Sequence, residues 1–286
     1  MEVIKHWTRW SNVSTNRKIF SATLVIASLT LAAKIVSTAK ELVVAASFGT
    51  GDAIDAFLVA FLVPSVAVAV ISGSFNAAFI PTYIHVREQD GTESAQRLLS
   101  SVIAWSTVLL AAATLGIILG APLYLPLIAS GFDPAKILQT RRLLYLLSPI
   151  VMVAGVNTIW SAVLNAGEQF ALVAVTPALT PVVIIAFLLI AKTWGVTALA
   201  VGTCVGMVLE AAIVCRALLH KQIHPWPRWY GLDPHLTRII GQYLPMASGA
   251  FILASTSLIN QGMAAMLGPG SIAALNYGNR LIAVPI

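Results

Sequence analysis

The sequence predicts an all-α polytopic membrane protein with about seven complete transmembrane helices and the start of an eighth. Of its 286 residues, 58% are hydrophobic and only 10% are charged. Soluble domains carry about 25% charged residues, so this composition, with a mean hydropathy of +0.87, indicates an integral membrane protein. Its long apolar segments have the length that crosses a hydrocarbon core about 30 Å thick.

The apolar segments follow one another along the chain, separated by short stretches rich in Gly, Pro or charged residues. Pro64, Pro149, Pro177, Pro181 and Pro245 fall inside them and predict kinked helices packed in a bundle. The predicted spans are Ile19–Ser47, Asp55–Ile84, Leu98–Ala129, Ile137–Ala166, Phe170–Ala191, Val196–Leu219, Leu236–Leu267 and a last one from Ile272 onward.

The predicted organisation has four parts. Residues 1–18 form a cytoplasmic segment, either a helix on the inner membrane surface or a disordered tail, and residues 19–219 form a first six-helix lobe. Residues 220–235 form a basic, aromatic-rich cytoplasmic connector whose tryptophans suit the headgroup layer. Residues 236–286 begin a second lobe, and because the sequence stops inside the eighth span, we expect a fragment or truncation.

The distribution of Lys and Arg predicts that the N-terminus is cytoplasmic. With this orientation the inner segments hold ten of these residues and the outer segments hold four. The outer four include a cluster at Lys136–Arg142, for which we expect contact with the outer headgroups.

Two sequence patterns concern the arrangement of the helices, one an internal repeat and the other a close helix contact. Residues 48–64 (FGTGDAIDAFLVAFLVP) are similar to residues 267–285 (LGPGSIAALNYGNRLIAVP), since each has a Gly-x-Gly turn followed by an apolar helix that reaches Pro. This similarity indicates an internal repeat of the kind that transporters commonly contain. Gly202 and Gly206, spaced as Gly-x-x-x-Gly, predict a face where two helices pack closely.

Lys34, Lys40 and Glu41 lie within the first apolar segment. Lys34 falls about 22 Å beyond Ile19 along a helix, near the middle of a membrane. A charge there costs at least about 2.5–3.5 kcal/mol, so it should face protein or water. One interpretation is a polar stripe with Ser37 that lines a cavity, in which Glu41 partly neutralises Lys34. The other is a structural ion pair between helices, with Lys40 extending outward.

Other polar residues at membrane depth are weaker candidates. Asp55 either caps the second span or faces the cavity entrance, and Glu210 either pairs with Arg216 or serves as a coupling-ion site. Arg280 in the eighth span suits a phosphate because its planar guanidinium binds two oxygens at once. Uncharged residues that line the cavity or only pack between helices are Ser37, Ser65, Asn76, Asn260, Gln261 and Asn279.

Several function classes lack support in the sequence. The net charge of +6 is explained by cytoplasmic Lys and Arg, so no nucleic-acid partner is expected. We find no phosphate-binding loop for nucleotides, no zinc-protease motif and no nucleophile elbow, so neither enzymatic activity nor a metal or other cofactor is expected. Embedded charge that is mainly cationic favours transport of an anionic substrate.

Four segments of the sequence resemble one known family. FGTGDAIDAFLVAFLVP at 48–64 and GSFNAAFIP at 73–81 closely resemble the start of the MurJ/MviN flippases of the multidrug/oligosaccharidyl-lipid/polysaccharide exporter superfamily, and VLNAGEQF at 163–170 and NYGNRLIAVP at 276–285 also match. The resemblance implies fourteen helices, with two six-helix lobes around a central cationic cavity and two extra helices. It also implies alternating-access translocation of lipid II, the undecaprenyl-pyrophosphate-linked peptidoglycan precursor, across the bacterial cytoplasmic membrane.

The resemblance also assigns residues. Lys34 and Lys40 stand where the family typically has arginine, Glu41 matches an acidic neighbour, and Asp55 and Arg280 match charged residues of helices two and eight. Lys34, Lys40 and Arg280 would hold the pyrophosphate, while Glu41, Asp55 and Glu210 would set local charge or couple to ions. The partners implied are a polyprenyl-linked glycan, membrane lipids and cell-envelope biosynthesis proteins.

Departures from the family pattern leave the substrate open. Lipid II flippases carry an arginine in the middle of helix two, where this sequence has Val68, Ala69 and Val70, and Asn279 replaces an aspartate. A flippase for another lipid-linked oligosaccharide is therefore an alternative. A cation-coupled multidrug exporter and a non-transporting membrane scaffold are two more.

Overall fold

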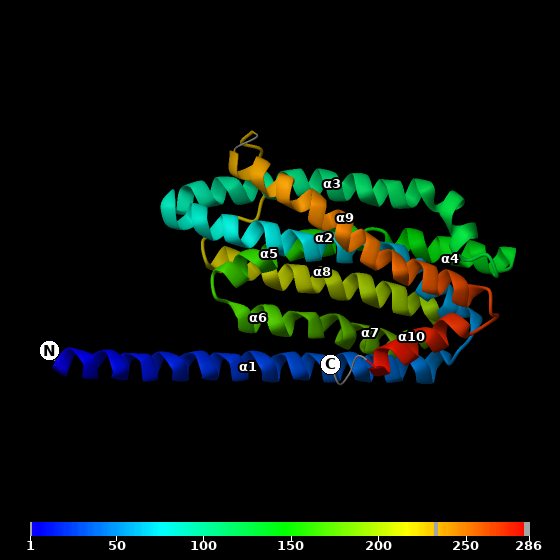
Figure 1. Cartoon of the computed structure of the whole chain (residues 1–286). Helices are drawn as coiled ribbons and strands as arrows, with labels where there is room; N and C mark the ends of the chain where they lie inside the picture. Colours follow the sequence, from blue (N-terminus) through cyan, green and yellow to red (C-terminus); the bar gives the residue numbers. More distant parts are fainter. Residues whose placement is uncertain (1, 232–233, 283–286) are drawn as a thin grey trace.

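The computed structural model describes residues 2–231 and 234–282, and every regular element within them is a helix (Figure 1). The elements are α1 (Glu2–Phe48), α2 (Asp52–Gln89), α3 (Gly91–Ile128), α4 (Pro134–Leu147), α5 (Ile150–Ala166), α6 (Phe170–Val175), η1 (Thr176–Ala178), α7 (Leu179–Ile190), η2 (Lys192–Trp194), α8 (Val196–His220), α9 (Pro234–Ala265) and α10 (Ser271–Ile282).

Seven helical segments of the described residues are long and apolar enough to cross a membrane, which confirms the predicted number of complete spans. Two of the spans are interrupted. The fourth breaks between α4 and α5 at Ser148–Pro149, and the fifth breaks at the 3-10 turn η1, which contains Pro177. Pro64 and Pro245, in contrast, lie inside uninterrupted helices.

The first helix is longer than the sequence predicts. Residues 2–18 continue directly into the first span as part of α1, rather than forming a separate segment. In Figure 1 the N-terminal part of α1 extends past the other helices, and its second half lies beside α6, α7 and α10.

The remaining helices form one bundle with two apolar cores. One core joins the first half of α2 to the end of α3 and to α4, α7 and α10. The other joins the second half of α2 to the first half of α3, the end of α8 and the start of α9. Helix α9 crosses α2 and α3 (Figure 1) and contributes Leu236, Ile239 and Tyr243 to the second core. The predicted second lobe therefore begins in close contact with the first.

Helices α7 and α8 pack closely through the predicted glycine face. A Cβ atom added to Gly206 would lie 2.7 Å from the Cα of Thr180, and one added to Gly202 would lie 3.1 Å from the Cα of Ile184. Real Cβ atoms do not approach backbone atoms as closely as the first of these distances. The spacing of these two glycines thus allows the α7 and α8 backbones to touch.

Gly206→Ala is expected to destabilise the protein by about 1–3 kcal/mol, because the added methyl group must push α7 away. Thermal unfolding in detergent would show this as a lower melting temperature. Gly116→Ala is the matched control, since Gly116 also lies within a spanning helix but has open space where the Cβ would be. We expect it to be neutral or slightly stabilising. Equal melting temperatures for the two variants would contradict the close α7–α8 contact.

The two segments of the predicted repeat touch each other, and each places a glycine of positive φ in the turn between two helices. Gly49 (φ +57°) and Gly268 (φ +111°) each lie in a turn between two helices, in a conformation that favours glycine. The Tyr277 hydroxyl donates a hydrogen bond to the Gly49 carbonyl at 3.0 Å. A Cβ atom on Gly270 would collide with the Thr50 carbonyl, so this position also requires glycine. The turn before α2 and the turn before α10 therefore lie at the same end of the bundle.

Candidate functional site

A cavity of about 160 Å³ lies between α1, α2, α7, α8 and α10. Its apolar wall comes mainly from α2, α7 and α8, while its charged groups come from α1 and α10. The polar residues that line it are Ser37, Lys40, Glu41, Thr180, Thr203, Asn276, Tyr277 and Arg280.

Two cations in this cavity share one carboxylate. The Lys40 ammonium lies 2.6 Å from the Glu41 Oε1, and the Arg280 Nε lies 3.4 Å from the same oxygen. The side chains of Lys40 and Glu41 are largely buried, whereas that of Arg280 is 61% exposed. The three charges sum to one positive charge at a place where α1 and α10 meet. The structure thus brings together Ser37, Lys40, Glu41 and Arg280, and their role in binding stays a prediction.

Lys34 lies outside this cavity. Its side chain is exposed on α1, and Glu41 pairs with Lys40 and Arg280 instead. The predicted neutralisation of Lys34 by Glu41 is wrong, because Glu41 lies seven residues further along the helix, at a distance of about 10 Å. The alternative is right in part: Glu41 of α1 forms an ion pair with Arg280 of α10, but Lys40 does not extend outward, since its side chain is only 17% exposed and lines the cavity.

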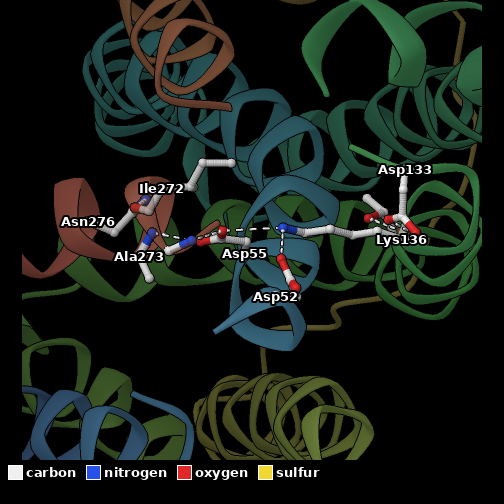
Figure 2. Close-up of polar contacts among 9 residues, drawn as sticks. Asp52, Asp55, Asp133, Lys136, Ile272, Ala273 and Asn276 are labelled. Atoms are coloured by element: carbon white, nitrogen blue, oxygen red, sulfur yellow. Dashed lines mark hydrogen bonds and ion pairs between the residues drawn. The ribbon is translucent and has the colours of Figure 1, made fainter. Parts of the chain in front are cut away.

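Asp55 caps the start of α10, not its own helix. Its carboxylate accepts hydrogen bonds from the Gly270 N–H (2.7 Å) and the Ala273 N–H (2.9 Å), as Figure 2 shows. These are two of the backbone donors that a helix start leaves without partners within the helix. Asp55 is fully buried and does not border the cavity, so both predicted positions for it are wrong.

Lys136 balances the charge of this buried carboxylate. Its ammonium lies 3.4 Å from Asp55 and 2.6 Å from Asp52, and 3.9 Å from the centre of the Phe132 ring (Figure 2 shows the two carboxylates). The side chain of Lys136 is only 9% exposed. The predicted contact of Lys136 with outer headgroups is therefore wrong. Asp133, which caps α4, fixes the start of the helix that carries this lysine.

Glu210 also caps a neighbouring helix. Its Oε1 accepts a hydrogen bond from the Thr180 N–H at 3.1 Å, in the first turn of α7. The break at η1 creates this helix start and so leaves backbone donors that need partners. The predicted pair with Arg216 is wrong, because residues six apart point about 120° away from each other around a helix and lie about 9 Å apart along it. No described contact tests the alternative of a coupling-ion site, so it stays a prediction.

The predicted uncharged lining residues are spread over the bundle. Ser65 donates to the Leu62 carbonyl of its own helix, Gln261 has a buried Oε1 without a partner, and Asn260 and Asn279 are exposed. Asn76 lies within α2, but its side chain is outside the described residues. Apart from Ser37, the uncharged polar residues that line the cavity are ones that the sequence did not single out. Asn276 was detectable, because it lies one turn before Arg280 on the same face of α10.

The fold and the cavity together define a class of protein, a multi-pass helical membrane protein with a charged cavity between its helices. A solved structure titled lipid II flippase MurJ, inward closed conformation, superimposes with a TM-score of 0.78 at 20% identity, and the match covers 92% of this chain and 55% of that one. An outward-facing multidrug resistance MATE family transporter of the MOP superfamily superimposes with a TM-score of 0.64 at 16% identity, covering 92% of this chain and 60% of that one. At these identities the likeness shows the fold alone.

Sequence comparison identifies the family. The family model for lipid II flippase MurJ matches residues 44–286. The chain is 28% identical to lipid II flippase MurJ of Burkholderia cenocepacia, over 93% of this chain and 54% of the relative. It is 29% identical to a protein of Rhizobium tropici described as a probable lipid II flippase MurJ, over 92% of this chain and 51% of the relative. The chain belongs to the MurJ family, a family of transporters rather than enzymes, and spans about half the length of these relatives.

Proposed function

We propose that the protein containing this chain translocates a polyprenyl-pyrophosphate-linked saccharide, of the lipid II type, across the bacterial cytoplasmic membrane. The observation that carries the proposal is the meeting of Lys40 from α1 and Arg280 from α10 in one cavity, with a single carboxylate between them. A pyrophosphate offers several oxygens, so it can replace Glu41 as the partner of both cations. The cavity then shields the charged headgroup from the hydrocarbon core.

Lys34 is proposed as a second contact along the substrate path. It lies six residues before Lys40 on α1, about 9 Å along the helix axis, and its side chain is exposed. An exposed cation at this position could meet the phosphate before or after it occupies the Lys40 and Arg280 site.

The proposed mechanism is alternating access between two lobes, with the N-terminus in the cytoplasm. In that orientation the starts of α2, α4 and α10 lie at the outer end of the bundle. The bonds of Asp55 to α10 and to Lys136 would then hold the outer end closed. Opening to the outside would require these bonds to break, and membrane potential or an ion gradient would supply the energy.

A flippase for a different lipid-linked oligosaccharide is the second candidate. It is favoured by the apolar stretch Val68–Val70 of α2, which contributes no cation where lipid II flippases carry an arginine. Lysine at positions 34 and 40 keeps the positive charge but lacks the planar fork that binds two oxygens.

Binding to the chain in nanodiscs tests the proposal. The ligands are lipid II, undecaprenyl monophosphate, a lipid-linked oligosaccharide without peptide, and a cationic drug. We expect both pyrophosphate-linked lipids to bind more tightly than the monophosphate by at least tenfold, because the second phosphate adds charge-assisted hydrogen bonds. The order of the two glycans decides between the two candidate substrates. Preference for the cationic drug would instead indicate a multidrug exporter, and no binding at all would indicate a scaffold.

A further inference from the structure

The connector between α8 and α9 is held in place by a side chain of α3. The Gln96 side chain accepts a hydrogen bond from the His224 N–H (3.2 Å) and donates one to the His224 carbonyl (2.8 Å). The Arg228 N–H also donates to the Ser100 carbonyl at 3.4 Å. Pro225 and Pro227 restrict the backbone between these two attachments. The connector is therefore an irregular segment with a fixed shape.

This fixed segment presents aromatic side chains to its surroundings. Trp226, Trp229 and Tyr230 are 57%, 56% and 54% exposed. A water-soluble surface seldom holds three exposed aromatic residues within five positions, because they have apolar area to bury. Trp and Tyr at the ends of membrane spans, however, characteristically lie among lipid headgroups.

The same segment carries two basic residues that have no acidic partner among the residues that the structure describes. Lys221 and Arg228 are exposed, and neither forms an ion pair with any other described residue. Two acidic residues near the α2–α3 turn pair with other groups, since Asp90 lies 3.6 Å from His235 and Glu93 lies 2.6 Å from Arg97. The connector thus offers aromatic rings and free positive charge on one exposed segment.

We propose that the surface formed by Lys221, Trp226, Arg228, Trp229 and Tyr230, called the connector surface below, binds the headgroup layer of an anionic phospholipid bilayer. The connector joins the ends of two membrane spans, α8 and α9, so it lies at the level of the membrane surface. The tryptophans enter the interface, and the two cations contact phosphate and other acidic headgroup atoms. This inference does not depend on what the cavity transports.

Quenching of tryptophan fluorescence by brominated lipid tests the proposal. The chain is placed in two sets of nanodiscs, one with brominated phosphatidylglycerol and the other with brominated phosphatidylcholine. The mole fraction of brominated lipid is the same in both sets. The signal of the connector surface is the difference between the unsubstituted chain and the Trp226→Phe/Trp229→Phe variant, which removes two of the seven tryptophans. We expect strong quenching by both lipids, and apparent binding of phosphatidylglycerol that is stronger by about fivefold for each of the two cations. Nanodiscs expose both faces of the bilayer, so the result is independent of orientation.

Charge variants separate lipid recognition from mere proximity to the membrane. The preference for phosphatidylglycerol should fall to about onefold in Lys221→Gln/Arg228→Gln, because each cation near an anionic surface contributes about a fivefold preference. Lys192→Gln is the matched control, since Lys192 is also a basic residue next to the end of a span but is far from the connector in sequence. Two results would overturn the proposal. One is equal quenching by the two lipids in the unsubstituted chain. The other is quenching by aqueous iodide but not by brominated lipid, which would show that the surface faces water and suits a soluble partner.

Discussion

Asp55→Asn is expected to release the start of α10 and to destabilise the protein by about 3–5 kcal/mol, as the loss of one partner from a buried ion pair typically does. The two carboxylate oxygens each accept one α10 N–H, and the carboxylate also balances Lys136. An asparagine has one acceptor oxygen, so one N–H loses its partner, and the amide group carries no charge. Hydrogen exchange at residues 270–273 should accelerate by roughly two to three and a half orders of magnitude, since 1.4 kcal/mol corresponds to a factor of ten.

Asp52→Asn is the matched control for this experiment. It makes the same chemical change in the second carboxylate that contacts Lys136, but the Asp52 side chain is 63% exposed and contacts no α10 donor in the described contacts. An exposed ion pair contributes at most about 1 kcal/mol, so exchange in α10 should hardly change. Similar effects of the two variants would show that the charge of Lys136, and not the cap on α10, determines stability at this end. Replacing Asp55 and Lys136 together should cost less than the two single changes added.

The sequence predicted the spans because hydropathy alone sets them. A segment of about 20 apolar residues must be helical in a membrane whatever its neighbours are, so the seven complete spans could be counted in advance. The positions of helix breaks depend on more than the presence of proline. Pro149 and Pro177 fall at breaks, whereas Pro64 and Pro245 do not, since a kinked helix can satisfy the freed carbonyl in several ways.

The partners of buried charges could not be predicted in the same way. Asp55 bonds to residues 215 and 218 positions away, and no local pattern specifies such a distance. The repeat was the sequence feature that pointed toward this contact, because the matching Gly-x-Gly turns at 49–51 and 268–270 suggested that the starts of α2 and α10 were related. Lys136 was assigned to the headgroups for the same reason, since exposure of a loop lysine is the default until a buried acid is known to lie beside it.

The cavity was predicted in part. Lys40, Glu41 and Arg280 were singled out because charge inside a span must have a partner, and the structure places the three together. Lys34 also lies within the first span but outside the cavity. The orientation of a helix about its own axis decides which of its residues are buried, and it depends on the neighbouring helices. Helical spacing argues against one pair that was predicted, that of Glu210 with Arg216, because residues six apart point about 120° away from each other around a helix.

Arg280→Ala is expected to weaken binding of a pyrophosphate-linked lipid about tenfold, which is the low end for a charge-assisted hydrogen bond and suits a side chain 61% exposed. The affinity of Arg280→Lys should lie between those of the unsubstituted chain and Arg280→Ala, because lysine keeps the positive charge but lacks the planar guanidinium. Glu41→Gln should act in the opposite direction and tighten binding up to about fivefold, since it frees Lys40 and Arg280 from a partly exposed ion pair. Affinity is measured in nanodiscs, with Lys192→Ala as a control outside the cavity.

The opposite signs of the Arg280 and Glu41 effects are what make this experiment decisive. Damage to the fold would weaken binding in both variants, whereas competition between a carboxylate and a phosphate for the same two cations must strengthen it when the carboxylate is removed. If Glu41→Gln weakens binding as much as Arg280→Ala does, Glu41 holds the cations in position rather than competing for them. The cavity would then be a preorganised site that depends on all three charges, and the proposed exchange of Glu41 for pyrophosphate would be wrong.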